Sequence, residues 1–385
     1  MVSLLFCGGA AGANAPVITH GPLLGEVTST SVRVWARTNE PATIEFHYGK
    51  GSASLDGRSD TIQTESSHDF TGWTTLQNLL SDTEYVVQVF IDGNPIGVPA
   101  TFRTLPDSDA LRDEAHNPRG LFNFSFTFGS CANQNPLHGI GPSLPTYTTL
   151  LDQHADEVDF QIMNGDWLYE ELRTTPVTAW AEKQGVDVDQ LPEVVVDMPT
   201  IVGVWENYKL YLDRGTNLSR WHRTVPGVFT FDDHELVNDI WGAGSTGRRN
   251  RRAVFRDIGT RAWLDYLGWA NPAAFPHPVH HGQATLTADS DVLVDPEADF
   301  TSLPLDEMLN LHVHWGTPEA GVNDLRFDDD SLGDPNSRVY EIREVLDKHR
   351  VRIFPVPVAD GKVHYSIGRR SYGSFRVANC EFFLL

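Results

Sequence analysis

Apolar and polar residues alternate along several short stretches of residues 16–106. In the segment 31–38, Ser-Val-Arg-Val-Trp-Ala-Arg-Thr, small apolar residues alternate with Arg, Trp and Arg. This period of two is typical of a strand with one buried and one solvated face. The pair Asp92-Gly93 separates the apolar runs 85–91 and 98–104, which predicts a hairpin. Residues 16–106 are therefore expected to form an all-β module.

A second feature of this module indicates the kind of β fold. Leu76, Leu79, Thr83 and Tyr85 form an L-x-x-L-x-x-x-T-x-Y run. This run resembles the corner of a fibronectin-type, immunoglobulin-like sandwich, in which the Tyr hydroxyl bonds back to the main chain. We expect such a module to serve packing, without chemistry of its own. Residues 107–120 are polar and rich in turn formers, so a linker is predicted there.

After the linker, the pattern changes to strands that alternate with helical stretches. Spacing is strand-like over 122–128, 158–163, 351–356 and 375–385, and helical over 147–157, 204–213 and 248–267. This alternation predicts an α/β (α+β) sheet covered by helices for residues 121–385. Residues 276–337 are rich in Pro, Asp and His and lack a clear period. We expect an inserted loop or a small hairpin there.

Composition and charge exclude several classes of function. The 385 residues include 29 Lys and Arg against 52 Asp and Glu, a net charge of −23. This charge repels phosphate backbones and anionic lipid, so specific nucleic-acid binding is not expected. No stretch of the sequence is long and apolar enough to span a bilayer. The three cysteines, Cys7, Cys131 and Cys380, exclude a disulfide framework, although a single bridge between Cys131 and Cys380 stays an alternative.

Residues 1–15 read MVSLLFCGGAAGANA, a short apolar patch followed by small residues. The triplet Ala13-Asn14-Ala15 resembles a signal-peptidase site, but a basic n-region is missing. Two interpretations stay open, the remnant of an export signal and an irregular start of the gene. The first predicts a secreted, periplasmic or cell-surface protein.

Reactive side chains stand where three apolar strands are predicted to end. The strands end at Ser130-Cys131, at the run Asn164 to Glu170, and at Asp232-Asp233-His234-Glu235. In open α/β sheets, ligands bind outside the carboxyl ends of the strands, so the three loops should converge. Carboxylates crowded in a partly dry crevice need a counter-charge, and a cation also favours an anionic thiol or phenol. The sequence therefore predicts a metal site, against the simpler interpretation of solvated acidic loops and a buried cysteine.

Taken together, the three motifs resemble a known family. Ser130-Cys131, Gly165-Asp166-Trp167-Leu168-Tyr169-Glu170, and Asp232-Asp233-His234-Glu235 followed by Asn238 and Asp239 are similar to the motifs of PhoD-like alkaline phosphatases. These belong to the calcineurin-like metallophosphatase superfamily. A fibronectin-type domain before the catalytic domain is a further similarity to PhoD-like and purple acid phosphatases. The resemblance covers most of the chain, and residues 276–337 least well.

The resemblance implies roles for five residues. Asp166 matches the aspartate that bridges two metal ions, Tyr169 the tyrosinate ligand of Fe3+, and Cys131 an iron-binding cysteine. Asp233 stands at the place of the metal-binding Asn in an Asn-His-Glu motif, so it is the expected ligand of the second ion, for which Ca2+ is implied. His234 would protonate the leaving oxygen or hold the phosphoryl group. The implied activity is metal-dependent hydrolysis of a small phosphomonoester or phosphodiester.

The resemblance also raises a doubt about activity. In the family, a strand like Phe382-Phe383-Leu384-Leu385 continues into Asp-Thr-Arg and a second half that carries further metal-binding His and Asp residues. A chain that lacks this C-terminal half is expected to bind metal weakly and to hydrolyse little. The alternative function, from another class, is a non-catalytic binding or adhesion protein with a degenerate metallophosphatase domain.

Other clusters are weaker candidates for function. Five arginines lie within 248–256, and a salt-bridged outer helix face is a simpler interpretation than phosphate contact. Asp328-Asp329-Asp330 lacks the spacing of a calcium loop. Two groups of histidines are candidate minor metal sites, although loop histidines are mostly solvated: His277, His280 and His281, and His312 with His314.

Overall fold

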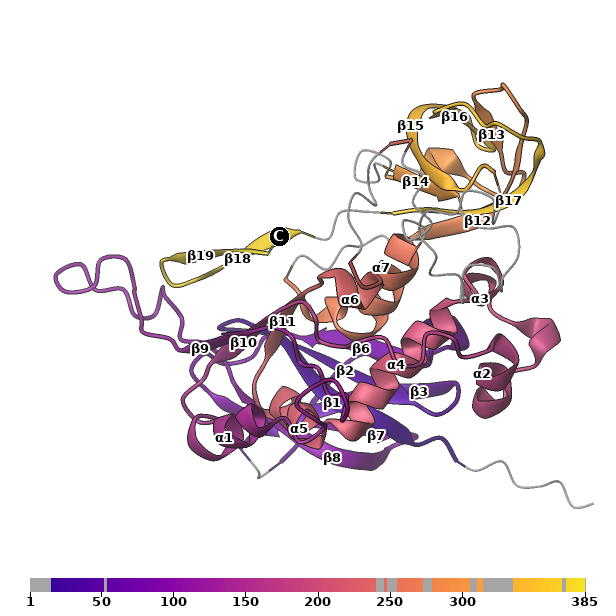
Figure 1. Ribbon diagram of the computed structural model, residues 1–385. Helices are drawn as coiled ribbons and strands as arrows, with labels where there is room; N and C mark the ends of the chain where they lie inside the picture. The colour runs from indigo at the N-terminus through magenta and orange to yellow at the C-terminus, as the bar shows by residue number, and fades with distance from the viewer. Residues whose placement is uncertain are drawn as a thin grey trace, which may run out of the picture.

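The computed structural model describes residues 15–51, 54–239, 246–247, 255–272, 279–304, 310–313, 335–368 and 372–384. It contains an N-terminal sandwich, a small parallel sheet with helices, and a barrel (Figure 1). Of the expected export signal, only Ala15 lies within the described residues. Within the described part of the chain, no helix has the length and apolar character needed to cross a membrane.

The N-terminal part is a sandwich of two antiparallel sheets. One sheet has the order β1-β2-β6, and the other has the order β4-β3-β7-β8 with β5 paired to β3. The strands are β1 (Ile18–Val27), β2 (Val32–Thr38), β3 (Ala42–Lys50), β4 (Gly57–Arg58), β5 (Ile62–Thr64), β6 (Thr71–Leu76), β7 (Glu84–Ile91) and β8 (Asn94–Arg103). Alternate apolar residues such as Val34, Phe46 and Val87 are fully buried between the sheets, which is the packing that the sequence period requires.

Two local predictions for the sandwich are confirmed. The hydroxyl of Tyr85 accepts the backbone N–H of Leu80 at 2.8 Å, so the tyrosine corner is present. Asp92 and Gly93 join β7 to β8 with φ of 50° and 77°, the left-handed pair that a two-residue hairpin turn needs.

The prediction that β2 has one solvated face is wrong. Trp35 on its outer face is fully buried, and its indole N–H donates to the backbone carbonyl of Asp265 at 2.8 Å. Arg33, on the same face, donates to the carbonyl of Trp269 at 2.9 Å. The second domain covers this sheet, so both faces of the strand are buried.

The sandwich and the helices meet at a buried ionic cluster centred on Asp69, just after the short helix η1 (Ser66–His68). Asp69 is 0% exposed. Arg37 of β2 donates to it at 3.0 Å, and Lys209 lies 3.1 Å from it. The indole N–H of Trp180 donates to it at 3.2 Å, and the Tyr266 hydroxyl donates to its other oxygen. One carboxylate therefore joins elements of both domains.

The second domain is built on three parallel strands in the order β11-β10-β9. The strands are β9 (Phe126–Gly129), β10 (Phe160–Asn164) and β11 (Gly227–Thr230). The helices are α1 (Pro145–Gln153), α2 (Val177–Gln184), η2 (Val188–Gln190), α3 (Glu193–Asp197), α4 (Ile201–Arg214), α5 (Thr216–Thr224), α6 (Asp233–Leu236), α7 (Phe255–Tyr266) and η4 (Gly268–Ala270). Buried tryptophans dominate the helical core: Trp167, Trp180, Trp205, Trp221 and Trp263. Of the expected helix 248–267, residues 248–254 lie outside the described part of the chain.

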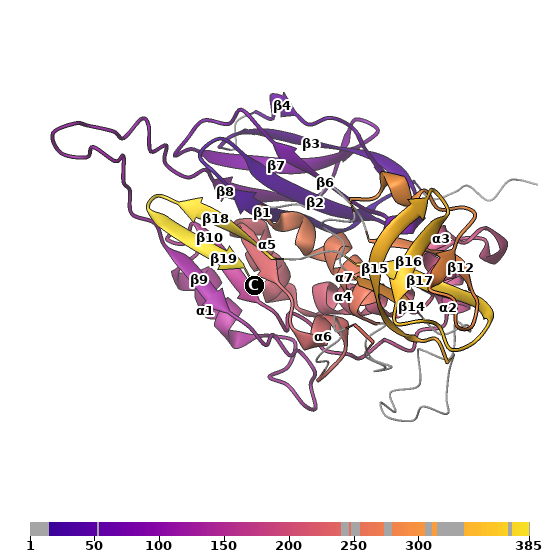
Figure 2. The same cartoon turned by 90° about the horizontal axis from the view of Figure 1, so that it is seen from above.

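A closed six-stranded barrel follows, with the order β12-β13-β16-β15-β14-β17. Its strands are β12 (His280–Leu286), β13 (Val292–Val294), β14 (Asn310–Val313), β15 (Arg338–Asp347), β16 (Arg350–Phe354) and β17 (Gly361–Ile367), and η5 (Phe300–Ser302) lies between β13 and β14. Strands of the expected insertion 276–337 thus pair with later strands, and the unit extends to Ile367 instead of forming a separate loop or hairpin. Figures 1 and 2 show the barrel beside α7.

The described chain ends in a hairpin of β18 (Gly373–Val377) and β19 (Cys380–Leu384). The hairpin packs on the small parallel sheet through rings: Phe382 lies 5.2 Å from Phe126 and 5.6 Å from Phe160 between centroids. The expected apolar segment 375–385 is therefore two strands with a turn between them.

Candidate metal centre

The three parallel strands bring the predicted site residues to one edge of the sheet. Cys131 follows β9, Asp166 follows β10 and Asp233 begins α6 after β11. The first two loops are joined directly, because the N–H of Ala132 donates to the carbonyl of Asp166 at 2.8 Å. Parallel strands end on the same side, so their loops form one crevice.

The turn after β10 has an unusual backbone. Gly165 has φ of 78° and Asp166 has φ of 53°. A Cβ atom on Gly165 would lie 2.6 Å from the backbone nitrogen of Asp232, so the two loops approach too closely for any side chain there. Asp166 is thereby held with only 9% of its surface exposed. Strained turns of this kind cluster at functional sites.

Asp166 is the centre of the cluster. Its Oδ2 accepts the Tyr169 hydroxyl at 3.1 Å and the Cys131 thiol at 3.4 Å. One ligand atom each from Asp166, Asp233 and His234 lie within 4.8 Å of one another. All five residues predicted for the site therefore lie around one carboxylate.

The other oxygen of Asp166 tests whether this cluster fits a metal ion. Oδ1 is buried and has no hydrogen-bond partner among the described residues. An unsatisfied buried carboxylate oxygen is costly, whereas a cation would satisfy it and offset the charges of Asp166 and Asp233. The donor set of carboxylate, phenol, thiol and imidazole contains ligand types that proteins use for transition metals and for hard cations. The residues fit the metal centre that the sequence predicted.

Tyr169 and His234 pack against each other, with ring centroids 3.9 Å apart. Burial, the hydrogen bond with Cys131 and the charge of Asp166 raise the pKa of the Tyr169 hydroxyl. Without a cation the phenol is therefore protonated and donates to Asp166.

Glu170 has a role that the sequence did not reveal. Its Oε2 lies 2.7 Å from Nδ1 of His234, and its Oε1 accepts the N–H of Asn238 at 2.5 Å. Burial opposes the charge on His234, but the hydrogen bond with Glu170 raises the pKa of His234 above its usual value. Glu170 thus orients the imidazole and holds the loop behind it.

Glu235 is a second residue whose role was missed. It is 0% exposed, and its carboxylate accepts the backbone N–H groups of Asp166 at 3.0 Å, Trp167 at 2.5 Å and Asp232 at 2.9 Å. Burial raises its pKa to about 7, against the effect of these hydrogen bonds. The spacing of Asp232 and Glu235 is that of a capping box, which is the sequence signal that could have indicated this role.

Arg173 supports the same short helix from its other end. Its guanidinium donates to the carbonyls of His234 at 2.7 Å, Glu235 at 3.2 Å and Leu236 at 2.5 Å. A four-residue helix makes few hydrogen bonds of its own, so side chains satisfy its ends. No motif in the sequence marked this residue.

The alternative disulfide is absent: Cys131 and Cys380 are both free thiols. Of the candidate histidines, His277 and His314 lie outside the described residues. His312 lies 3.2 Å from Asp257 in the buried contact between the barrel and α7. Among the described residues, the metal-ligating group at Asp166 contains neither Cys380 nor His312.

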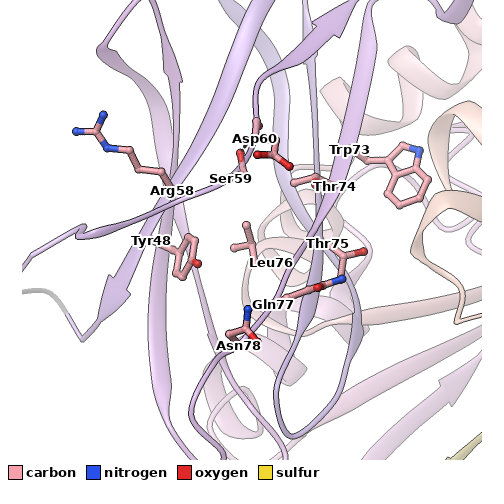
Figure 3. Close-up of a pocket in the computed structure, with 10 residues that line it drawn as sticks. All are labelled: Tyr48, Arg58, Ser59, Asp60, Trp73, Thr74, Thr75, Leu76, Gln77 and Asn78. Carbon is pink, nitrogen blue, oxygen red and sulfur yellow. Dashed lines mark hydrogen bonds between the residues drawn. The ribbon is translucent and has the colours of Figure 1, made fainter.

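A separate hollow of about 580 Å3 lies on the sandwich and is lined by residues between Tyr48 and Asn78 (Figure 3). Figure 3 shows Tyr48, Leu76 and Asn78 around it, with Arg58 and Trp73 pointing outward. It lacks a cluster of metal-ligating or nucleophilic groups, so the loops after β9, β10 and β11 remain the better candidate for a functional site.

Comparison with protein families matches two parts of the chain. Residues 126–285 match the model of the PhoD-like phosphatases. The chain therefore carries a PhoD-like phosphatase domain. Residues 15–109 match a separate model, described as a domain of unknown function, DUF7800. No curated protein matches the chain.

The solved structures to which parts of this chain are similar are distant in sequence. A structure of PhoD is 17% identical with a TM-score of 0.48, and the match covers 67% of this chain and 47% of that one. The purple acid phosphatase PPD1 of yellow lupin is 14% identical with a TM-score of 0.38, covering 66% and 40%. A fibronectin-type domain of human collagen XX is 21% identical with a TM-score of 0.20, covering 26% of this chain and all of its own. The chain spans about half the length of the PhoD structure.

The PhoD-like domain of this chain includes every residue of the centre around Asp166. It also includes the two supporting residues, Glu170 and Arg173, and it ends within β12 of the barrel. The candidate metal centre and the residues that support it thus lie in the segment that matches the PhoD-like model.

Proposed function

We propose that this protein is a metal-dependent phosphoric ester hydrolase whose centre is Asp166. The observation that supports this most directly is the meeting of Cys131, Tyr169, Asp233 and His234 around that carboxylate, inside a PhoD-like phosphatase domain. The buried Oδ1 of Asp166, which lacks a partner among the described residues, is the second support.

The proposed ligands and metals are those that the resemblance to PhoD-like phosphatases implies, and the donor types agree with them. Asp166 would be the central metal-holding residue, since one of its oxygens meets the thiol and phenol and the other is buried without a partner among the described residues. Tyr169 and Cys131 would hold Fe3+ as anions, and Asp233 would hold Ca2+ through oxygen. When bound, two cations supply charge to the phosphoryl oxygens and acidify an attacking water.

His234 is the proposed catalytic residue of the chain itself. Glu170 accepts from Nδ1 of the ring, so Nε2 is the nitrogen left for the substrate. From there it can donate a proton to the leaving oxygen or a hydrogen bond to the phosphoryl group. Contact with the ring of Tyr169 limits rotation of the imidazole and keeps this direction fixed.

The proposed substrate is a small phosphomonoester or phosphodiester. The net charge of −23 works against long polyanions, because steering at long range would repel them. A secreted or periplasmic location is part of the proposal, on the strength of the N-terminal segment and the fibronectin-type module.

Hydrolysis of a chromogenic phosphomonoester and a phosphodiester by the metal-loaded chain tests this function. We expect turnover that is lost in Asp166→Asn and retained in Asp152→Asn, a matched change at an exposed residue of α1. A visible absorption band of a tyrosinate bound to iron should disappear in Tyr169→Phe. Absence of bound metal and of turnover in a full-length version of the protein would refute the enzyme and favour the non-catalytic binding protein.

A further inference from the structure

A second group of ligating side chains lies between helix α3 and the barrel. Glu193 and Asp197 stand four residues apart on α3 and so share one face of the helix. Figures 1 and 2 show α3 beside β12, the strand that carries His281. One ligand atom from each of the three residues lies within 4.8 Å of the others. The group shares no residue with the centre around Asp166.

The imidazole of His281 is poorly satisfied in the contact between α3 and β12. Both of its ring nitrogens are buried and neither has a hydrogen bond of full geometry among the described residues; besides the carboxylates, the backbone of Val279 is a polar neighbour that acts on the ring as a hydrogen-bond partner. Its Nε2 lies 4.0 Å from Oδ2 of Asp197, which is too far for a hydrogen bond. A neutral imidazole always has a donor and an acceptor to satisfy, so this position calls for a further group between the ring and the carboxylate.

Asp197 is already oriented for such a group. Its Oδ1 lies 3.1 Å from Nδ1 of His364 and accepts from the amide of Gln283 at 3.3 Å. Gln283 and His364 are register partners on β12 and β17, so the barrel holds this oxygen from two strands. Hydrogen bonds of this kind orient the carboxylate ligands of metal ions. Its Oδ2 is the oxygen on the side of His281.

We propose that Glu193, Asp197 and His281 bind a divalent ion of the zinc type, which ties α3 to the barrel. Ligands of a tetrahedral zinc ion lie about 2.1 Å from it and hence about 3.4 Å from each other. The present 4.0 Å between His281 and Asp197 needs a closure of roughly half an ångström, which side-chain rotation supplies. The donor set of one imidazole and two carboxylates suits zinc among the metals of the cell.

The surroundings leave room for the remaining ligand. A cavity of about 500 Å3 is lined by the three residues and also by Asp295, Glu297 and Lys362. It is large enough for water at an open coordination position.

The neighbouring His280 does not belong to this site. It lies on the opposite side of β12 and its Nε2 is 3.0 Å from the hydroxyl of Tyr365, which in turn donates to Asp295 at 2.7 Å. The sequence grouped His280 with His281, but alternate residues of a strand face opposite sides. The partners of His281 come instead from a helix more than eighty residues earlier in the chain.

Titration of the metal-free full chain with Zn2+ by calorimetry tests the proposal. An Asp166→Asn, Asp233→Asn double variant serves as the reference, because it weakens the centre around Asp166 and isolates the second group. We expect this reference to bind one equivalent of Zn2+, and the addition of Glu193→Gln or His281→Ala to weaken that binding at least tenfold. Glu193 is exposed, so its variant keeps the fold even where loss of His281 does not.

Two controls make the result decisive. Glu157→Gln, at another exposed glutamate, should leave the Zn2+ affinity of the reference unchanged. Absorption of bound Co2+ in the visible range should fall in parallel with Zn2+ affinity in Glu193→Gln. Equal Zn2+ affinity in the reference with and without Glu193→Gln and His281→Ala would overturn the proposal, as would a reference that binds no Zn2+.

Discussion

The buried carboxylate of Asp69 offers a direct test of how the two domains are held together. Asp69→Asn keeps the volume of the side chain but removes its charge. Arg37 and Lys209, which are 3% and 4% exposed, would then keep Glu206 as their buried carboxylate. Glu206 lies 2.5 Å from Lys209 and is also paired with the exposed Lys183. Two buried cations would share one carboxylate.

The magnitude follows from this imbalance. Removing one partner of a buried ion pair destabilises a protein by about 3–5 kcal/mol, because the remaining charge stays desolvated. With a urea m value of about 3 kcal/mol/M, the midpoint of unfolding should fall by roughly 1 to 1.7 M. Tryptophan fluorescence reports the transition, since Trp180 donates directly to Asp69 and Trp205 packs 5.6 Å from Trp180.

An exposed pair gives the matched control. Asp82 and Arg103 lie 2.9 Å apart with 57% and 55% of their side chains exposed. Asp82→Asn should change the free energy of unfolding by about 0–1 kcal/mol, as surface pairs do. Equal shifts in the two variants would refute the claim that burial makes the Asp69 contacts matter.

The dependence of this effect on pH has a definite sign. Burial alone would raise the pKa of Asp69, but Lys209 and Arg37 outweigh it and hold the pKa at about 2. Because this value lies below that of an unfolded aspartate, the contribution is full above about pH 5 and is lost as the pH falls toward 2. The difference in urea midpoint between wild type and Asp69→Asn should therefore shrink over that range, and a constant difference would contradict the reasoning.

Three further predictions concern the centre and its support. Gly165→Ala should abolish iron binding, because a Cβ at this position would clash with the backbone of Asp232. Metal analysis of the purified variant checks this, and a normal iron content would contradict the close approach of the two loops. Glu235→Gln should destabilise the chain by about 1–3 kcal/mol in thermal unfolding, since a buried amide cannot accept all three N–H groups, and Glu157→Gln at the surface should not. Burial lowers the pKa of His222 to about 3, so the free energy of unfolding should fall as the pH drops from about 6.5 toward 3. His222→Gln should make the urea midpoint depend less on pH over this range. An unchanged pH dependence would contradict the role given to His222.

The sequence predicted the sandwich well because its signals are local. The turn at Asp92-Gly93 and the corner at Tyr85 each depend on residues a few positions apart, and both are confirmed in the structure. The buried outer face of β2 could not be predicted in the same way. Trp35 is covered by α7, more than two hundred residues later, and no local pattern carries that information.

The barrel was missed for a related reason. Its strand β13 has three residues and β14 has four, which is too short for alternation to stand out. Its pairing is also remote, since His280 of β12 lies opposite Ile367 of β17. Closure of a barrel satisfies every strand edge, and this gain depends on all six strands together. Taken alone, the segment 276–337 therefore shows only many Pro, Asp and His residues, and no alternation of apolar and polar positions that would predict strands.

The centre around Asp166 was predictable because one topological rule connects local motifs. Each motif stands directly after an apolar strand, and parallel strands in one sheet end at the same edge. The rule places Cys131, Asp166 and Asp233 together without any knowledge of distances. It says nothing about Glu170 or Arg173, whose roles arise from how the four-residue helix α6 is held at its ends. Residues that bind directly can thus be inferred from where strands end, whereas residues that orient them depend on the path of the loops between strands.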